Sequence, residues 1–365
     1  MRVLFYHAPR HWSGSARAFA AAARALHERE WEVTFVCAPQ SPVEERIASE
    51  GYEIAPSSME GGWVAGAYRL RRILENRFVE VVFVHGQREH LVAAAGTRLA
   101  ERGAVVRRIA AGDRFQVGGP GRMARRMATT GYLFASDAER AAAQPYPRWA
   151  LEPLVAELGV TPERYEDVRA VPRAGLGAGQ AARLIVAVYH ERARARLATV
   201  FRTIAMLAPR HPELRLALVG RGSDAEELRM HAAALGITKI VSHLGEREDQ
   251  LGVLRAADIG WVVADGDEAA YACLDFMALR IPVLAERGQL PQHYLADGIA
   301  GILLPPSDAP ATAALVASFL AHEGQRTAMG AAGRVRVARD FVESEMVDGF
   351  ERAALAARDR TRWIR

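Results

Sequence analysis

The feature that most constrains this chain is a repeated alternation of short, continuously apolar runs with longer helical patterns. The run at residues 2–9 is rich in β-branched and aromatic residues, which is typical of a buried strand. An alanine-rich helical pattern follows at residues 13–30, and a second apolar run occupies residues 32–39. Strand, glycine turn, helix and strand form the βαβ unit of a parallel sheet, whose strands are apolar on both faces. The alternation therefore predicts a doubly wound α/β chain.

The alternation occurs twice, before and after a segment rich in proline and glycine. It stops near residue 145 and restarts near residue 182. At about 150 residues per domain, a chain of 365 residues predicts two domains. The expected parts are an N-terminal Rossmann-like domain at 1–147, a linker at 148–181, a C-terminal Rossmann-like domain at 182–340 and a terminal helix at 341–365.

Composition limits the functional class. The chain is 50% hydrophobic and 25% charged, and its net charge of +4 does not argue for nucleic acid as a partner. Cys37 and Cys273 lie far apart in apolar contexts, which indicates a reducing compartment, and no spacing of Cys or His matches a metal site. We find neither a signal peptide nor an apolar run long enough to span a membrane, so we expect a cytoplasmic protein.

Ligands of open α/β sheets lie at the carboxyl ends of the strands, so the turns there are the candidate sites. Gly14 and Ser15 open the first helix, whose free N–H groups suit a phosphate, although a simple capped helix start explains them equally well. Gly220 and Gly222 begin a GxGxxA pattern. No acid ends the next strand to hold a ribose, which disfavours a nicotinamide cofactor.

Two further groups of polar residues follow strands of the second half. His190, Arg192, Arg194 and Arg196 come directly after a strand and suit a diphosphate, or they form a solvated charge run. Farther along, two acids lie eight positions apart in a mostly apolar segment, at 267 and 275. A carboxylate can accept hydrogen bonds from two ribose hydroxyls, but an acid-rich loop before an amphipathic helix explains the spacing as well.

Taken in order, these segments resemble the retaining, nucleotide-sugar-dependent glycosyltransferases of the GT-B fold, the family typified by sucrose synthases and mannosyltransferases of bacterial glycolipids. The resemblance covers nearly the whole chain. It rests on the phosphate turn SGSARAFAAAARALHERE, the strand VEVVFVHG, the segment YLFASDAER, the linker LGVTPERY, the turn LALVGRGSDAEEL, the strand KIVSHLG, the helix LGVLRAADIGW, and the acids before FMALRIPVLA.

The resemblance implies two doubly wound domains facing a cleft, with the C-terminal helix crossing back to the N-terminal domain. It implies a hexosyltransferase that moves a sugar from a nucleotide sugar, such as a UDP- or GDP-sugar, with retention of anomeric configuration. The acceptor would be a glycan, a glycolipid or a small molecule, as in polysaccharide or glycolipid biosynthesis. Neither a metal nor a cofactor is implied.

The resemblance also implies roles for individual residues. Asp275 would hold the ribose and Asp267 the donor sugar. The catalytic group would comprise His85, His190, Arg194, Arg196 and Asp267. Donor binding would involve Gly14, Ser15, Gly220, Gly222, Leu244, Glu268, Ala270, Tyr271 and Asp275, and the acceptor side Arg108 and Asp113.

This chain departs from the family pattern at several of these positions. Both family glutamates are aspartates, the basic clamp is altered, and the second histidine of the N-terminal domain is missing after AVVRR. These departures leave open a catalytically inactive binding or scaffold protein. A metal-dependent transferase that uses Asp265 and Asp267 is a further alternative. A hexosamine 2-epimerase is also conceivable on this scaffold, but its expected acid and histidine constellation is not found.

Basic residues cluster in the N-terminal half, and few acids interrupt them. They are Arg107, Arg108, Arg114, Arg122, Arg125 and Arg126, mixed with Phe115 and Met123. Such a segment can contact an anionic membrane or a lipid-linked acceptor, here around Arg122 to Arg126, or it can be a flexible basic loop. We therefore expect a cytoplasmic protein that can lie peripherally at the inner face of the membrane.

Overall fold

The structure, a computed structural model, describes residues 1–57, 61–113, 115, 119–144 and 151–364. Arg114 and the expected domain boundary at 147/148 lie outside these residues. The chain divides into two units. Unit 1 comprises Met1–Leu158 together with Glu343–Arg365, and unit 2 comprises Gly159–Val342.

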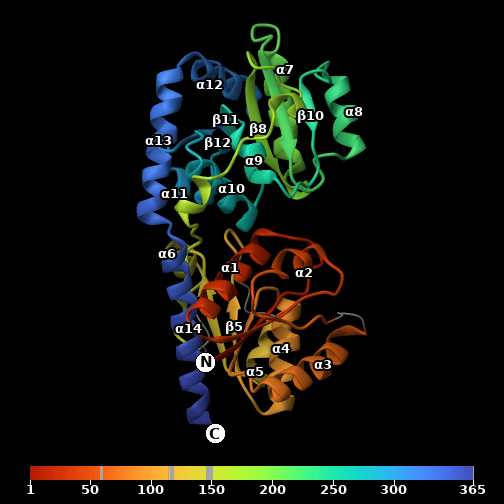
Figure 1. The fold of residues 1–365 in the computed structure, drawn as a ribbon, viewed down its shortest axis with the longest axis vertical. Coiled ribbons are helices and arrows are strands. Elements are labelled where there is room, and N and C mark those ends of the chain that lie inside the picture. The colour runs from red at the N-terminus through yellow and green to blue at the C-terminus, as the bar shows by residue number, and fades with distance from the viewer. Residues whose placement is uncertain (58–60, 114, 116–118, 145–150, 365) are drawn as a thin grey trace. The chain divides into compact units, whose positions relative to one another are not determined.

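Unit 1 contains a parallel sheet in the order β3-β2-β1-β4-β5-β6-β7, counted over the described residues (Figure 1). Its strands are β1 (Arg2–Tyr6), β2 (Glu32–Val36), β3 (Glu53–Ile54), β4 (Val81–Val84), β5 (Ala104–Arg108), β6 (Thr130–Phe134) and β7 (Leu154–Val155). Its helices are α1 (Gly14–Glu28), α2 (Pro42–Ile47), α3 (Gly62–Arg77), α4 (Gln87–Ala100), α5 (Gly119–Met127), α6 (Asp137–Ala142) and α14 (Glu343–Ile364). The expected doubly wound sheet is thus confirmed.

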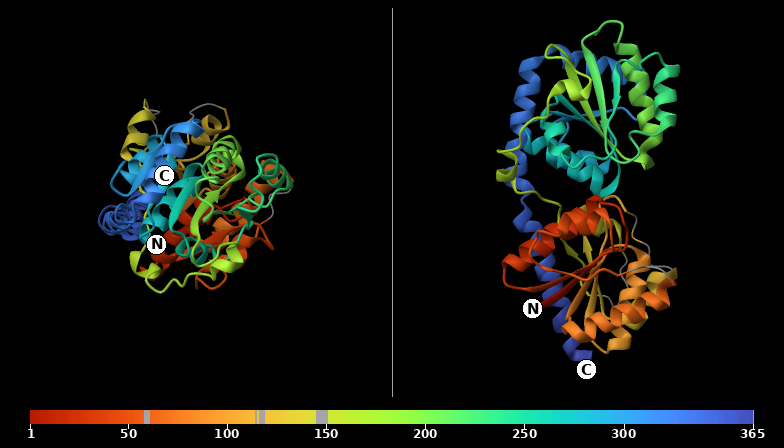
Figure 2. Two further views of the ribbon diagram at one scale, coloured as in Figure 1. Left: turned by 90° about the horizontal axis from the view of Figure 1, so that it is seen from above. Right: turned by 45° about the vertical axis from the view of Figure 1, so that its right-hand side comes forward.

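Strand β1 shows how the unit 1 sheet is buried on both faces, because successive side chains of a strand point to opposite faces. Phe5 stacks on Phe83 of β4 at 4.8 Å between ring centroids and also contacts Phe350 of α14. Leu4 and Tyr6 belong instead to a core cluster with residues of α3, α4 and α5. Figures 1 and 2 show α3, α4 and α5 side by side.

The last helix, α14, is part of unit 1 although unit 2 precedes it in the chain. Arg24 of α1 donates to Glu343 at 2.5 Å, and Arg29 pairs with Asp348 at 2.7 Å. A Cβ at Gly349 would lie 2.6 Å from the carbonyl oxygen of Val155, so only glycine lets the helix approach β7 this closely. The return of the last helix to the N-terminal sheet, implied by the resemblance, is therefore observed.

Unit 2 contains a second parallel sheet, in the order β10-β9-β8-β11-β12-β13 over its described residues. The strands are β8 (Arg183–Tyr189), β9 (Leu214–Val219), β10 (Val241–His243), β11 (Ile259–Val263), β12 (Val283–Glu286) and β13 (Gly301–Leu304). The helices are η1 (Pro162–Tyr165), η2 (Arg173–Leu176), η3 (Glu191–Ala193), α7 (Arg194–Leu207), α8 (Glu226–Ala234), α9 (Gln250–Arg255), α10 (Gly266–Ala278), α11 (Gln289–Leu295), α12 (Ala309–Ala321) and α13 (Glu323–Asp340), of which the η helices are short 3-10 turns.

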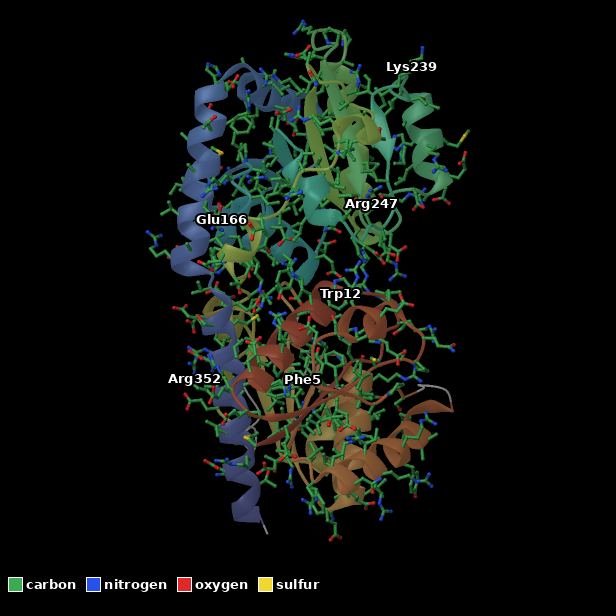
Figure 3. The ribbon with its side chains drawn as sticks, in the orientation of Figure 1. Phe5, Trp12, Glu166, Lys239, Arg247 and Arg352 are labelled. Atoms are coloured by element: carbon green, nitrogen blue, oxygen red, sulfur yellow. The ribbon has the colours of Figure 1, made fainter. Side chains whose placement is uncertain are left out.

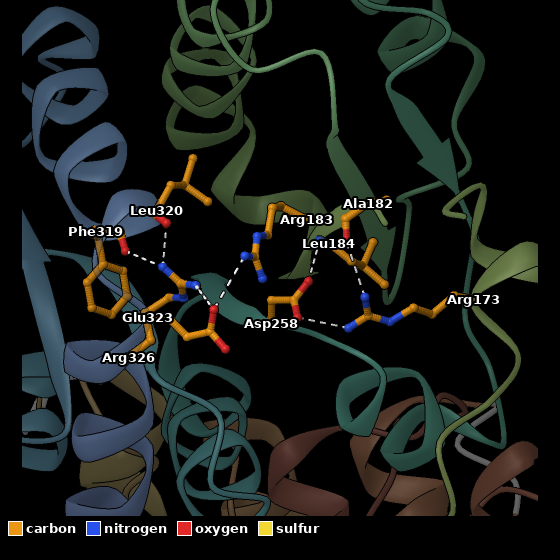
Figure 4. Close-up of polar contacts among 9 residues, drawn as sticks. All are labelled: Arg173, Ala182, Arg183, Leu184, Asp258, Phe319, Leu320, Glu323 and Arg326. Carbon is orange, nitrogen blue, oxygen red and sulfur yellow. Dashed lines mark hydrogen bonds and ion pairs between the residues drawn. The ribbon is translucent and has the colours of Figure 1, made fainter. Parts of the chain in front are cut away.

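A polar network fixes the amino ends of the central strands of unit 2 (Figure 4). Asp258, just before β11, accepts from Arg173 of η2 at 2.9 Å and from the backbone N–H of Leu184 in β8 at 2.7 Å. Arg326 of α13 donates to the carbonyls of Phe319 and Leu320 at the end of α12. These bonds fix the amino ends of β8 and β11 and the turn between α12 and α13.

The strand orders place a topological switch point in each unit. The direction of chain progression reverses between β1 and β4 in unit 1, and between β8 and β11 in unit 2. In such sheets the crevice for a ligand lies outside the carboxyl ends of the two strands that flank the reversal. The residues that follow β1, β4, β8 and β11 are therefore the candidates for function in each unit.

Candidate functional site

Helix α10 carries both predicted acids of the donor site. It follows β11 directly, and Asp267 and Asp275 are each only 1% exposed. Eight residues turn an α-helix by roughly 80° beyond two full turns, so the two side chains lie on neighbouring faces. Burying a carboxylate is costly unless it is hydrogen-bonded, which makes both positions unusual for a purely structural helix.

Asp275 is held by a residue of the linker segment. The hydroxyl of Tyr165, at the end of η1, donates to Oδ1 of Asp275 at 2.5 Å. The next residue, Glu166, labelled in Figure 3, pairs with Arg334 of α13 at 2.5 Å and with Arg280 after α10 at 3.4 Å. Hydrogen bonds and ion pairs therefore tie the segment LGVTPERY and Glu166 to α10 and its neighbours. The resemblance had matched the segment and the acid-bearing helix separately. No role for Tyr165 was predicted from the sequence, although it lies in a segment that carries the resemblance.

The basic residues after β8 do not act as one group. Arg194 pairs with Glu227 of α8 at 2.6 Å, and both side chains are largely exposed. Arg196 turns to the end of β11, where its Nη2 donates to the carbonyl of Ala264 at 3.1 Å and pairs with Asp265 at 2.5 Å. His190 caps η3, since its Nδ1 accepts from the N–H of Arg192 at 3.2 Å.

The glycine turn after β9 is explained largely by packing. Gly220 and Gly222 have φ of 112° and 78°, which L side chains rarely adopt. A Cβ at Gly220 would lie 2.3 Å from the carbonyl oxygen of Tyr189 at the end of β8. In the same turn, the hydroxyl of Ser223 is fully buried and has no hydrogen-bond partner among the described residues. The N–H of Leu244 donates to the carbonyl of Leu218 at 2.9 Å, so it extends the sheet.

The remaining predicted donor residues of unit 2 lie in the first turns of α10. Ala270 and Tyr271 are buried, whereas Glu268 is half-buried. All three thus follow the carboxyl end of β11, where the sequence placed them, and their roles remain predictions.

In unit 1, Gly14, Ser15 and His85 lie after the carboxyl ends of β1 and β4. Ser13 caps α1 by accepting from the N–H of Ala16 at 3.1 Å, and the first turn of α1 contains no acidic residue. Nε2 of His85, which directly follows β4, lies 2.9 Å from the carbonyl oxygen of Ser15. The β4 histidine and the N-terminus of α1 are thus connected, as a shared ligand site requires.

Aromatic and basic side chains fix His85 from two further directions. The ring of Phe19 stacks on the imidazole at 3.7 Å between centroids. Nε of Arg107, on β5, donates to the carbonyl oxygen of His85 at 2.9 Å. Burial lowers the pKa of the Arg107 guanidinium.

Three buried titratable residues near these strands, His7, Glu89 and His90, were not predicted from the sequence. Burial and the charge of His11 lower the pKa of His7 to about 4, and neither ring nitrogen of His7 has a partner among the described residues. Burial, with the charges of Arg107 and Arg125, lowers the pKa of His90 to about 3. Burial raises the pKa of Glu89 above its ordinary value. The one signal in the sequence for these three residues is that they follow the predicted strands β1 and β4.

Of the two residues predicted for the acceptor side, one is buried and one is exposed. The side chain of Arg108 is fully buried on β5, whereas Asp113 is exposed. Residues 119–127 of the basic segment form helix α5 rather than a loop, and Arg125 is buried and donates to the hydroxyl of Tyr132 at 3.1 Å. Arg125 is therefore not available to a membrane surface, which corrects that part of the expectation. Arg122 and Arg126 remain exposed.

Neither cysteine offers a reactive thiolate to this site. Cys37 and Cys273 are free and buried, and burial raises the pKa of each thiol to about 12. Within the described ranges, no three His, Cys, Asp or Glu side chains are grouped so as to hold a metal ion. None of the helices in those ranges has the length and apolar character needed to cross a membrane.

Comparison with known proteins finds a family match within unit 2. Residues 173–336 match the family model of glycosyl transferases group 1. The lipopolysaccharide core biosynthesis glycosyltransferase LpsE of Rhizobium meliloti (strain 1021) is 25% identical over 150 residues, which cover 41% of this chain and 44% of that protein. The D-inositol 3-phosphate glycosyltransferase of Corynebacterium jeikeium (strain K411) is 33% identical over 141 residues, 36% of this chain and 33% of that protein. The matches thus span less than half of these curated relatives.

The fold extends the likeness to both units. The crystal structure of Anabaena HepE in complex with UDP and glucose superimposes with a TM-score of 0.79 and covers 96% of this chain and 98% of that chain. The identity is 14%, so this likeness concerns the fold. The expected class of two Rossmann-like sheets is confirmed.

Proposed function

We propose, from the premise that residues 173–336 form a domain of the glycosyl transferases group 1 family, that the protein transfers a sugar from a nucleotide sugar to a glycan or lipid-linked acceptor. The observation that carries the proposal is the pair of buried acids on α10, the helix that follows β11 in the matched domain. The short bond from Tyr165 fixes Asp275 in one orientation. A preorganised carboxylate suits ribose hydroxyls, which are hydrogen-bond donors.

The donor is a nucleoside diphosphate sugar in this proposal, and a UDP-sugar is the first to test. HepE, whose fold is similar, was solved with UDP and glucose. Asp275 would accept from the ribose, and Asp267 from hydroxyls of the sugar. Both sit on one helix, so one rigid element would set the distance between nucleoside and sugar.

The chemistry of the proposal is a transfer with retention that needs neither a metal nor a cofactor. The bond from the anomeric carbon to the diphosphate oxygen breaks, and the acceptor oxygen bonds to the same face of that carbon. The acceptor proton passes to the departing diphosphate oxygen. Arg196, Arg194 and His190 would stabilise the charge that develops on the diphosphate.

The acceptor would approach along an exposed face of unit 1 that mixes apolar and basic residues. Helices α3 and α5 both contact α4, so they flank it on the same side of the sheet. The exposed members of this face, which we name the α3–α5 face, are Trp63, Val64, Tyr68, Arg72, Arg122, Met123 and Arg126. Exposed apolar side chains and arginines on α3 and α5 suit an anionic lipid surface, which supports a lipid-linked acceptor.

Nucleotide binding tests the donor half of the proposal. We expect one of UDP, GDP or ADP to raise the melting temperature of the protein, unaffected by EDTA, because a ligand stabilises the state that binds it. Asp275→Ala should abolish the shift. Asp308→Ala is the matched control, since Asp308 caps α12 by accepting from Ala311 and lies outside the site. A complete absence of shifts would indicate an inactive relative, and a shift that requires a metal would indicate Asp265 and Asp267 as ligands.

Vesicle binding tests the acceptor half. We expect the protein to cosediment with phosphatidylglycerol vesicles and not with phosphatidylcholine vesicles. Replacing Trp63 and Met123 by serine should weaken the binding, and so should reversing the charges of Arg122 and Arg126. Met230→Ser is the control, because Met230 is 63% exposed on α8 of unit 2. Equal binding by the control and the unit 1 variants would contradict the assignment of this face.

A further inference from the structure

The contact that the proposed donor site leaves unexplained is the one between Arg196 and Asp265. Both are in unit 2: Arg196 lies in the first turn of α7, and Asp265 immediately precedes α10. A single nitrogen of the guanidinium, Nη2, bonds both to the carboxylate, at 2.5 Å, and to the carbonyl of Ala264, at 3.1 Å. Two acceptors on consecutive residues fix the guanidinium at the carboxyl end of β11.

Asp265 occupies a position where aspartate ordinarily has a different role. It is the N-cap residue of α10, with extended backbone angles, yet its side chain accepts no hydrogen bond from that helix. N-cap aspartates usually accept from the second or third N–H of the helix. The carboxylate of Asp265 is directed at Arg196 instead, so helix capping does not account for this residue.

The pair links the segments that follow β8 and β11, the two strands that flank the switch point of unit 2. Helix α7 follows β8 and α10 follows β11, and these strands are neighbours in the sheet. A diphosphate at this edge would lie between the two helix starts. Arg196 is the better fixed of the two candidate arginines, because its side chain is 28% exposed whereas that of Arg194 is 62% exposed.

We propose that Asp265 is a positioning residue that holds Arg196 in place for the diphosphate of the donor. The inference rests on the proposed function and deepens it, because it selects Arg196 over Arg194 as the diphosphate-binding arginine. It also assigns Asp265 to an arginine rather than to a metal ion. The carboxylate does not touch the reacting atoms in this role and acts through the guanidinium.

The proposal predicts that the Asp265→Asn change slows turnover without weakening ground-state binding. In Asp265→Asn the guanidinium is held less firmly, and misplacing a charge-stabilising group lowers the rate of the chemical step. We expect kcat for hydrolysis of the nucleotide sugar, which needs no acceptor, to fall about tenfold. The same change removes a negative charge near the diphosphate, so the Kd for the nucleoside diphosphate should stay the same or decrease by about threefold.

The experiment measures both quantities in a set of variants. The nucleoside diphosphate is the one among UDP, GDP and ADP that the wild type binds by calorimetry, and turnover uses its glucose conjugate. In the Arg196→Ala background, Asp265→Asn should have no further effect on kcat, because the residue acts through Arg196. Asp265→Glu should recover part of kcat. Asp308→Asn, at a true N-cap of the same unit, should lower stability without separating kcat from Kd.

The outcomes separate this inference from the proposed function. If the wild type binds and hydrolyses a donor but Asp265→Asn leaves kcat unchanged, the positioning role is wrong and the function stands. A parallel loss of kcat, affinity and melting temperature would show a structural role only, and would also overturn the inference. If the wild type binds none of the three nucleotides, both the function and the inference fail.

Discussion

His7 and His90 of unit 1 are buried in the neutral form, which couples stability to pH. The pKa of His7 is lowered to about 4 and that of His90 to about 3, from an ordinary value of 6.5. Below pH 6.5 the unfolded chain binds protons that the folded chain excludes, so folding becomes less favourable as the pH falls. This loss continues until the pH reaches the folded-state values.

The free energy of unfolding should therefore decrease on acidification. Between about pH 7 and pH 5 each of the two histidines should account for a loss of about 2 kcal/mol. Urea denaturation at several pH values measures it, and His90→Gln should flatten the dependence. His322→Gln changes an exposed histidine and should leave the profile unchanged. A profile that is equally steep in His90→Gln would contradict the argument.

The element that organises the candidate site is α10, and its position depends on one glycine of β11. A Cβ at Gly260 would lie 2.6 Å from the ring of Phe276, which is fully buried on α10. Since Phe276 directly follows Asp275, a shift of this ring would move the predicted ribose ligand. The glycine therefore lets α10, which carries both acids, pack closely on β11.

Gly260→Ala should destabilise the protein by about 1–3 kcal/mol, because overpacking a tight core forces the helix or the ring to move. It should also weaken nucleotide binding, which calorimetry measures separately from urea denaturation. Gly324→Ala is the matched change in α13, where a Cβ would meet nothing within 4 Å. That variant should be as stable as the wild type or slightly more stable. Equal stability of the Gly260 and Gly324 variants would rule out the packing argument.

At the scale of the whole molecule, the end of the chain completes the unit that the beginning starts. Phe350 of α14 is fully buried among Phe5, Phe19 and Phe83, with ring centroids 5.3–6.1 Å away. The segment Gly159–Val342 between them forms the other unit. The core of unit 1 is therefore complete only when the last helix is present.

Phe350→Ala should destabilise unit 1 by about 3–5 kcal/mol through the cavity it leaves. Hydrogen exchange should then be faster in β1 and β4, and unchanged in β8 and β11. Phe319→Ala, which removes a buried ring of α12, should give the reverse pattern. Faster exchange in β8 after the change at Phe350 would show that α14 does not belong to the core of unit 1 alone.

Periodicity predicted most of the elements but missed β7 and α5. The long apolar runs and alanine-rich helices of both sheets were predictable because burial on both faces leaves a strong pattern. Strand β7 has only two residues within the proline-rich segment, and α5 contains three glycine and proline residues at its start. Local propensity opposes both elements, so tertiary contacts decide them.

The sequence by itself determined the fold class, the two-sheet organisation, the positions of Asp267, His85 and Gly14 close to strand ends, and that of Asp275 on the helix after β11. Each of these depends on local patterns of burial and turn chemistry, which a linear sequence displays. Only the tertiary structure decided the partners: Tyr165 on Asp275, Asp265 on Arg196, and Arg125 turned inward to Tyr132. Such partners are far apart in the chain, and a residue's type does not reveal which distant group will meet it.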